Sequence, residues 1–263
     1  MTPKDTPRLH FHRYEFKYLL SPRQLAGIVR ELDLRLERDV HSGPDGSYFV
    51  RSHYFDTDSF HLYHEKLAGL QNRYKFRMRS YSSTRMYSDP LFLELKGRKG
   101  NLVYKHRMLL EPASVEEALE NGMKRLTGLL LDGGGLCSTG ARFVFDVFRK
   151  RISPSVVVDY YRTAFENRAN PDFRVTLDSC MLAYRAGDNG HPTGAGRMIS
   201  DGLHVLEIKF RYRMPAWFLR LIQEFQLKQV SFSKFAYATS AVYMDSIAGN
   251  LDIMIERRPA CFS

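Results

Sequence analysis

The chain has 263 residues, of which 44% are hydrophobic, which is enough for a sizeable core in one or two domains. Its 39 lysines and arginines against 29 acids give a formal charge of 39 − 29 = +10, which favours an anionic partner such as nucleic acid, a membrane surface or a phosphorylated ligand. No apolar run reaches the roughly 18–20 residues needed to cross a bilayer, and the first residues lack a secretory signal, so we expect neither a membrane span nor a leader.

Alternation of polar and apolar residues, which is typical of strands with two different faces, is the commonest pattern along the chain. It predicts eight strands, at residues 11–19, 47–55, 73–81, 91–96, 102–110, 155–162, 172–178 and 203–211. Caps and apolar residues at helical spacing predict four helices, which start near Ser21, Ser114, Pro215 and Ser233. Ser21 and Gln24 form a capping box around Pro22, and Ser114 and Glu117 form a second one.

Two glycine-rich stretches, Asp132–Gly140 and Gly187–Gly196, are predicted to be flexible loops. Neither lies between a strand and a helix in a crossover, so a dinucleotide-binding fold is not supported. No GxxxxGK[ST] phosphate loop occurs either. Because there is no internal repeat and no clear linker, the sequence predicts a single domain over residues 1–263.

One predicted strand concentrates positive charge on one of its faces. Its cations are Arg73, Lys75, Arg77 and Arg79, and they alternate with Tyr74, Phe76 and Met78. Side chains on one face of a strand lie roughly 6.5–7 Å apart, so four cations share a narrow strip. Taken alone, this strip is explained by the solvated outer face of an ordinary antiparallel sheet.

The same division recurs on five further predicted strands. Their charged faces carry Arg13, Glu15 and Lys17; Glu94 and Lys96; Lys105 and Arg107; Arg174 and Asp178; and Glu207, Lys209 and Arg211. We predict an α+β fold in which the charged faces line an antiparallel β-barrel and helices cover its apolar outside. Since like charges disfavour one another inside a protein, such a lumen requires a polyanion as ligand. A flat sheet with a basic face that binds nucleic acid would show a similar alternation.

Glutamates accompany the cations in three pairs, Glu15/Lys17, Glu94/Lys96 and Glu207/Lys209. Carboxylates would repel phosphate, whereas Mg²⁺ or Mn²⁺ is held by a few carboxylates together with phosphate oxygens. The three glutamates are therefore candidate ligands of Mn²⁺ or Mg²⁺. The alternative is that they only neutralise neighbouring lysines.

Two observations bear on partners and compartment. Surfaces that bind nucleic acid usually interleave bases with exposed aromatics, but here the aromatics lie on the face opposite the cations, so we expect no nucleic-acid partner. Cys137, Cys180 and Cys261 are widely spaced, odd in number and without metal-ligand spacing. This pattern favours reduced thiols and a cytoplasmic location.

Nine segments, in order, resemble the polyphosphate polymerase domain of vacuolar transporter chaperone (VTC) complexes, a family of the CYTH-like triphosphate tunnel metalloenzymes. The segments are R-Y-E-F-K-Y (13–18), S-H-Y-F-D-T-D (52–58), R-Y-K-F-R-M-R-S-Y (73–81), L-E-L-K (93–96), Y-K-H-R (104–107), V-D-Y-Y-R (158–162), F-R-V-T-L-D (173–178), L-E-I-K-F (206–210) and S-F-S-K-F (231–235). They extend over nearly the whole chain. The resemblance implies an eight-stranded antiparallel β-barrel tunnel with helices packed on the outside.

The resemblance also implies roles for individual positions. Phosphate-binding positions of the tunnel wall correspond to Lys17, Arg77, Arg79, Lys96 and Lys105. Arginines near the bound triphosphate correspond to Arg162 and Arg174, with Lys209 beside them, and the S-K-F segment adds Ser233 and Lys234. Glu207 matches the main metal-binding carboxylate. The implied catalytic set is Arg77, Arg79, Lys96, Arg162, Arg174 and Glu207, while Ser233 has an alternative role as a helix N-cap.

The implied activity is that of a metal-dependent polyphosphate polymerase, which transfers the γ-phosphoryl group of ATP to a polyphosphate chain inside a basic tunnel. No general base is required, because the accepting phosphate oxygen is already anionic. Two alternatives stay open on the same fold: a triphosphatase acting on inorganic or organic triphosphates, and a non-catalytic module that binds polyphosphate or inositol polyphosphates. The expected partners are ATP and polyphosphate or triphosphate, and the composition is compatible with a membrane-protein partner.

Overall fold

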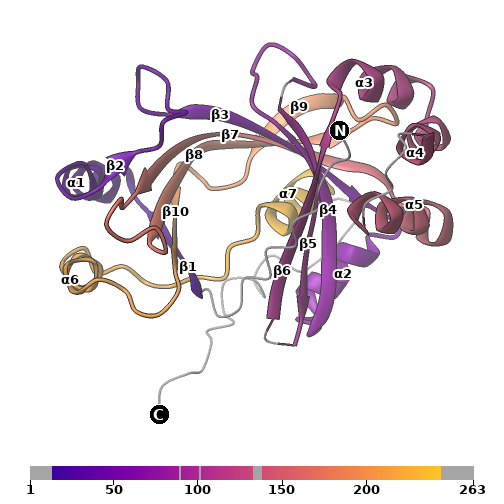
Figure 1. Ribbon diagram of the computed structural model, residues 1–263. Helices are drawn as coiled ribbons and strands as arrows, with labels where there is room; N and C mark the ends of the chain where they lie inside the picture. The colour runs from indigo at the N-terminus through magenta and orange to yellow at the C-terminus, as the bar shows by residue number, and fades with distance from the viewer. Residues whose placement is uncertain (1–13, 89, 101, 133–137, 244–263) are drawn as a thin grey trace. The chain divides into compact units, whose positions relative to one another are not determined.

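The computed structural model describes residues 14–88, 90–100, 102–132 and 138–243 (Figure 1). These residues gather into two compact units, each made of separate pieces of the chain. Unit 1 is formed by Val50–Asp159 and Leu182–Arg197, and unit 2 by residues 14–49, Tyr160–Met181 and residues 198–243. The prediction of a single domain over residues 1–263 stays a prediction.

The described residues form ten strands and seven helices. The strands are β1 (Tyr14–Leu20), β2 (Glu37–Arg38), β3 (Tyr48–Asp56), β4 (Asn72–Ser80), β5 (Leu91–Lys99), β6 (Leu102–Leu110), β7 (Ser153–Glu166), β8 (Arg174–Ala186), β9 (Pro192–Met198) and β10 (His204–Phe210). The helices are α1 (Pro22–Asp33), α2 (His61–Leu67), α3 (Pro112–Glu120), α4 (Met123–Asp132), α5 (Ser138–Lys150), α6 (Ala216–Glu224) and α7 (Lys234–Tyr243). Within the described ranges, every helix is too short or too polar to cross a bilayer.

Hydrogen-bonded ladders connect the strands in the order β1-β10-β8-β7-β3-β4-β5-β6, while β2 pairs with β7 and β9 with β8. The ladders β1–β10, β10–β8, β2–β7, β3–β4, β4–β5 and β5–β6 are antiparallel. The α+β class with a large antiparallel sheet is therefore confirmed. Among the described residues no ladder joins the two ends of this order, β1 and β6, so closure into an eight-stranded barrel tunnel is not confirmed.

All eight strands expected from the alternation are present, as β1, β3 to β8 and β10. The start of the first helix is also confirmed. Ser21 Oγ accepts a hydrogen bond from the Gln24 amide at 3.3 Å, and Gln24 Oε1 accepts one from the Ser21 amide at 2.9 Å. Arg13, Cys137 and Cys261 lie outside the described residues, and Cys180 is a free thiol.

The second predicted helix, which was expected to start near Ser114, starts earlier in the structure. Helix α3 begins at Pro112 rather than at Ser114. The carboxylate of Glu111 accepts hydrogen bonds from the amides of Ala113 at 3.1 Å and Ser114 at 2.6 Å, so Glu111 is the N-cap. A glutamate is a less common cap than serine, which is why the Ser114 box misplaced the start.

The prediction of a flexible loop over Gly187–Gly196 is wrong at its second half, because Pro192–Met198 forms strand β9 beside β8. A tight turn joins the two strands, with the Gly187 amide bonded to the carbonyl of His191 at 2.8 Å and Gly190 at φ +78°. Gly196 is required by packing, since a Cβ there would lie 2.6 Å from the Tyr184 ring. In the other glycine-rich stretch, residues 138–140 are helical, and 133–137 lie outside the described residues.

In unit 1, helices α2 and α5 contact strands β4, β5 and β6. Phe143 of α5 packs edge-on against Phe76 and Phe55, with ring centroids 5.2 Å and 4.9 Å apart. Phe76 belongs to the apolar face of β4, the face opposite its four cations. The helices therefore cover the apolar face in unit 1, as the alternation predicted.

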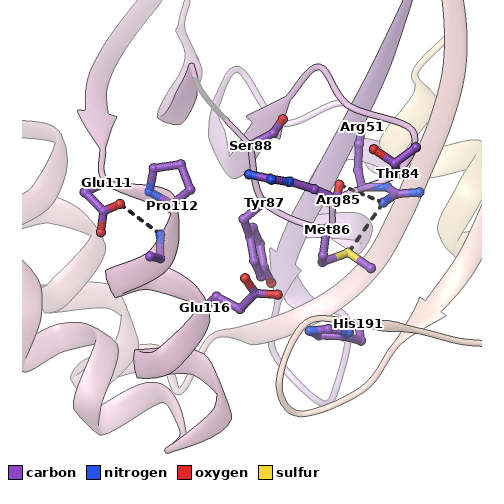
Figure 2. Close-up of a pocket in the computed structure, with 11 residues that line it drawn as sticks. Arg51, Thr84, Arg85, Met86, Tyr87, Ser88, Glu111, Pro112, Glu116 and His191 are labelled. Carbon is purple, nitrogen blue, oxygen red and sulfur yellow. Dashed lines mark hydrogen bonds between the residues drawn. The ribbon is translucent and has the colours of Figure 1, made fainter.

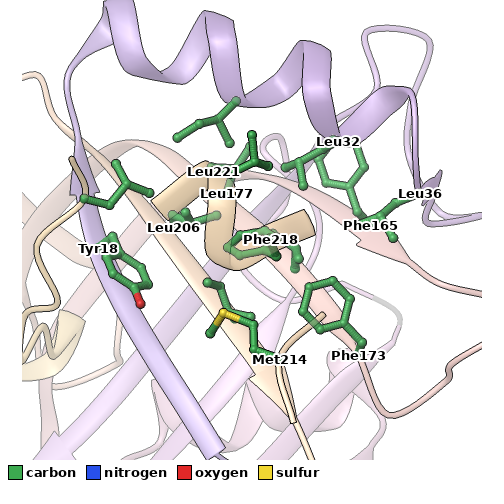
Figure 3. Close-up of a cluster of buried hydrophobic side chains, with 14 of the residues drawn as sticks. Tyr18, Leu32, Leu36, Phe165, Phe173, Leu177, Leu206, Met214, Phe218 and Leu221 are labelled. Carbon is green, nitrogen blue, oxygen red and sulfur yellow. The ribbon is translucent and has the colours of Figure 1, made fainter. Parts of the chain in front are cut away.

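In unit 2, the core is a cluster of buried side chains between strands and two helices (Figure 3). Leu32 comes from α1 and Leu221 from α6, and both pack with Leu177 and Leu206 of the sheet. Phe173 contacts Phe218 edge-on at 5.5 Å. The apolar side of β1, β8 and β10 is therefore buried in this core, and their charged side is the opposite one.

Candidate functional site

Eight cations share one face of strands β4, β5 and β6 in unit 1, which we call the basic face. Cross-strand partners point to the same side of a sheet, and the register pairs Lys75 with Lys96 and Lys96 with Lys105. The cations of the basic face are Arg73, Lys75, Arg77, Arg79, Lys96, Arg98, Lys105 and Arg107. Glu94 is the one acid among them, so these three strands contribute 8 − 1 = +7 to this face.

Glu94 lies at the centre of the basic face and is fully buried. Its carboxylate accepts hydrogen bonds from Arg77 Nε at 2.5 Å and Arg107 Nη2 at 3.0 Å, and it pairs with Lys105. Burial alone would raise the pKa of this carboxyl, but Arg77, Arg79 and Lys105 outweigh burial and hold the pKa well below its ordinary value. With three cations bound, Glu94 is better suited to holding those cations in place than to binding a metal.

Lys105 has an ammonium whose charge is sensitive to its neighbours. Burial lowers its pKa, Glu94 opposes this shift, and Arg77 and Arg107 add to it, so the pKa falls to about 7. Near neutral pH the ammonium is therefore only partly protonated. A phosphate group placed beside it would favour the charged form.

Unit 2 carries a second charged face, which we call the mixed face. It consists of Glu15 and Lys17 on β1, Glu207 and Lys209 on β10, Arg174, Thr176 and Asp178 on β8, Arg162 on β7, and Lys234 at the start of α7. It holds three acids against five bases, whereas the basic face holds one acid against eight. The charge of the mixed face is therefore closer to balance than that of the basic face.

Lys17 sits between two carboxylates of the mixed face. Its Nζ lies 3.1 Å from Glu15 Oε1 and 3.5 Å from Glu207 Oε2, and it donates a hydrogen bond to the carbonyl of Phe232 at 3.1 Å. Burial opposes the charged form, but Glu15 and Glu207 outweigh it and raise the pKa of Lys17. The two carboxylates thus flank one position that favours a cation.

This geometry decides which predicted metal ligands fit Mn²⁺ or Mg²⁺. Glu15 and Glu207 fit, because such ions are usually held by one or two carboxylates plus phosphate oxygens and water. Thr176, opposite Glu207 in the ladder, adds a buried hydroxyl for which the described residues supply no hydrogen-bond partner. Among the described residues no group of three or more His, Cys, Asp and Glu side chains is arranged to hold a metal, so a ligand's oxygens would have to complete the shell.

Asp178 organises two of the predicted phosphate-binding cations. It is fully buried and accepts hydrogen bonds from Arg162 Nε at 2.6 Å and Arg162 Nη2 at 2.8 Å, as well as from Lys234 Nζ. Burial would raise the pKa of Asp178, but Arg162 and Lys234 outweigh it and lower the pKa. Lys234 also lies 4.6 Å from the Tyr160 ring centroid. Sequence reasoning placed Asp178 on the charged face without a role, because no local signal connects it to Lys234.

Arg174 is similarly held by acids. Its guanidinium lies 2.6 Å from Asp39 Oδ2 and 3.1 Å from Glu166 Oε1. Asp39 gave no signal in the sequence, since it lies in a loop outside any alternating segment. Ser233 caps α7, with the Ala236 amide 3.4 Å from its hydroxyl, so its structural role is present and its contact with phosphate stays a prediction.

The structure therefore brings the predicted residues together in two sets. Unit 1 gathers Arg77, Arg79, Lys96, Lys105 and Glu94 on the basic face. Unit 2 gathers Glu15, Lys17, Arg162, Arg174, Glu207, Lys209, Ser233 and Lys234 around the mixed face. The sequence missed Arg98 because the predicted strand stopped at Lys96, whereas β5 continues through Gly97 to Lys99.

Comparisons with known proteins bear on the family of the chain and on its fold. No curated protein sequence matches the chain. Among solved structures, a proposed adenylate cyclase from Bacillus halodurans is similar with a TM-score of 0.50 and 15% identity, over 85% of this chain and 96% of that one, which shows a shared fold. A Pyrococcus horikoshii protein has a TM-score of 0.41 and 11% identity, over 83% of this chain and 92% of that one. Residues 12–243 match the family model of the VTC domain, and the chain therefore belongs to the VTC domain family.

Proposed function

We propose that the chain is a metal-dependent polyphosphate polymerase that transfers the γ-phosphoryl group of ATP to a growing polyphosphate chain. The observation that carries this proposal is the basic face, where eight cations surround one buried acid. Membership of the VTC domain family supports polyphosphate as the polyanion that neutralises this face. A cytoplasmic location and a membrane-protein partner stay predictions.

The basic face supplies the positioning that phosphoryl transfer needs. Arginine forks such as those of Arg77 and Arg79 bind two non-bridging oxygens at once, while lysines such as Lys96 act as point charges. A docking phosphate chain would compete with Glu94 for Arg77 and Lys105, which Glu94 already holds in place. The cations are thus ordered before the ligand arrives, and little side-chain entropy is lost on binding.

The mixed face supplies the residues suited to a metal. Glu207 and Glu15 would hold Mn²⁺ or Mg²⁺ together with phosphate oxygens, and a bound ion of this kind supplies electrostatic stabilisation of charge that develops on transferring phosphates. Lys17 and Lys209 form ion pairs with Glu207. The acceptor is an anionic phosphate oxygen, so no side chain has to remove a proton.

The test is a product analysis. The protein is incubated with ATP and Mn²⁺, and the products are separated by size and assayed for ADP. Long phosphate chains together with ADP support the polymerase. Release of orthophosphate without chains would replace it with a triphosphatase, and tight binding of tripolyphosphate without turnover would replace it with a binding module. A Lys124→Ala variant, which removes an exposed cation of α4, is the matched control and should behave like the wild type.

A further inference from the structure

A pocket of about 630 Å³ lies in unit 1, away from the basic face (Figure 2). One of its walls is Arg51 of β3. Arg51 alternates with Ser52, which pairs with Arg79 of the basic face, so Arg51 points to the other side of the sheet. The volume is within the range of about 300–1,000 Å³ that is usual for small-molecule sites.

Four separate chain segments build the pocket, and hydrogen bonds connect three of them. Arg51 pairs with Asp159 at 2.6 Å and 2.8 Å, and its Nη1 donates to the carbonyl of Arg85 at 3.4 Å, which holds the loop over residues 84–88. Tyr87 donates a hydrogen bond to the carbonyl of Asn189 at 3.2 Å, which connects that loop to the β8–β9 turn. The first turn of α3 closes the remaining side. The pocket is therefore formed before any ligand binds.

The polar groups that remain available in the pocket have opposite charges. Within the described part of the chain, neither the guanidinium of Arg85 nor the carboxylate of Glu116 has a hydrogen-bond or ion-pair partner. Figure 2 draws the Tyr87 ring between them. The other charged groups are occupied, because Arg51 is bound to Asp159 and Glu111 caps α3. One free cation thus stands against one free anion, whereas the basic face has eight cations and one acid.

His191 adds a polar ring to the same wall. Its Nε2 is buried and has no hydrogen-bond partner among the described residues, although it lines a pocket large enough for a ligand. Buried polar atoms in native proteins are nearly always satisfied, so an orphaned ring nitrogen on a residue that lines a pocket indicates a missing partner. Met86, Tyr87 and Pro112 contribute apolar surface beside it.

We propose that this pocket binds a small zwitterion with an apolar body, of the amino-acid or short-peptide class. Its carboxylate pairs with Arg85, its ammonium pairs with Glu116, and its body lies against Tyr87 and Pro112. Nucleotides and phosphate chains fit poorly, because Glu116 and Glu111 would repel them. The pocket is thus a second ligand site, chemically distinct from the basic face.

Titration calorimetry of the full chain with three forms of one dipeptide tests this proposal. The probes are alanyl-phenylalanine, its N-acetyl form, which lacks the ammonium, and its C-terminal amide, which lacks the carboxylate. The unmodified dipeptide should bind about fivefold more tightly than either capped form, as expected for one half-exposed ion pair at each end. Failure of the unmodified dipeptide to bind at millimolar concentration overturns the proposal.

Two variants assign each end of the ligand. Arg85→Gln should weaken binding of the dipeptide but leave the amide unaffected, and Glu116→Gln should weaken the dipeptide but leave the N-acetyl form unaffected. Arg125→Gln and Glu120→Gln, which remove exposed charges from α4 and α3, are the matched controls and should change nothing. If both pocket variants bind all three probes like the wild type, or if tripolyphosphate displaces the dipeptide and Arg85→Gln weakens tripolyphosphate, the assignment is wrong.

Discussion

Lys105 makes the charge of the basic face depend on pH. Its pKa of about 7 means that it loses its proton as the pH rises through neutrality, while a bound phosphate favours the protonated form. Tripolyphosphate binding should therefore take up one proton above pH 7, and affinity should fall by up to about tenfold per pH unit. Dissociation constants measured from pH 6 to 9 check this.

The matched variant is Lys105→Arg, which keeps its charge across that range. It should bind with a flatter pH dependence than the wild type on the same ligand, and an unchanged slope would contradict the role of Lys105. The unliganded protein offers a second check. Between about pH 7 and 10.5 the unfolded chain binds the Lys105 proton and the folded chain does not, so this residue makes the free energy of unfolding rise with pH in that window.

Replacement of Glu94 tests whether it holds the cations of the basic face in place or binds a metal. Glu94 is a buried acid bound to Arg77, Lys105 and Arg107. The Glu94→Gln variant should therefore be less stable than the wild type by about 3 kcal/mol or more, because three cations lose their partner. Tripolyphosphate should then raise the melting temperature of the variant more than that of the wild type, since the ligand supplies the missing negative charge. If Mn²⁺ alone stabilises the wild type and not the variant, Glu94 is a metal ligand instead.

The side of the sheet on which a residue lies was predictable only in segments that alternate. The faces of Arg77, Lys96 and Glu207 followed from period two alone, because cross-strand neighbours keep to one side of the sheet. Asp178 and Asp39 were not found as partners of Lys234 and Arg174, because each pair joins residues that are distant in the chain. No local pattern encodes such a contact.

At the scale of elements, strand β4 carries the largest share of the proposed binding. Arg77→Ala combined with Arg79→Ala should weaken tripolyphosphate binding at least about a hundredfold, because two charge-assisted hydrogen bonds of about 1.5 kcal/mol or more are lost. Calorimetry measures the affinity, and circular dichroism checks the fold. Lys124→Ala combined with Arg125→Ala removes the same charge from α4 and should leave the affinity within about twofold.

Should the double alanine variant fail to fold, Arg77→Lys with Arg79→Lys serves instead. It keeps both charges but loses the paired donors of the guanidinium, so its affinity should fall between the wild type and the alanine variant. If the folded alanine variant binds tripolyphosphate with wild-type affinity, β4 is not part of the binding surface.

The elements themselves differ in how well the sequence predicts them. Strands β4 and β10 alternate cleanly, because one side packs against apolar groups and the other carries charge. Helix α5 was missed, since its centre holds three phenylalanines and two valines, which are residue types that favour strands. Only the packing of Phe143 on Phe76 shows which of these rings faces the core. Propensity in such a segment is overridden by tertiary contacts.

At the scale of the whole molecule, the proposed function assigns separate contributions to the two units, and one pair of variants distinguishes them. Glu207→Gln, in unit 2, should lower the rate of polyphosphate synthesis at least about tenfold and leave tripolyphosphate affinity within about threefold. The variant Arg77→Ala with Arg79→Ala, in unit 1, should lose both the rate of synthesis and the affinity for tripolyphosphate. Rates with ATP and Mn²⁺ and dissociation constants for tripolyphosphate measure the two effects. Full activity of Glu207→Gln would remove this carboxylate from the metal role.

The ladder between β1 and β10 has a consequence for biosynthesis. It pairs Tyr14 with Phe210, so β1 leaves the ribosome long before the strand with which its backbone groups pair. Pairing at such separation is slow, and an unpaired strand edge invites association with other chains. During translation β1 therefore has an unpaired edge for longer than strands that pair with a neighbour in the sequence. Conditions that slow translation should lengthen this exposure and lower the soluble yield.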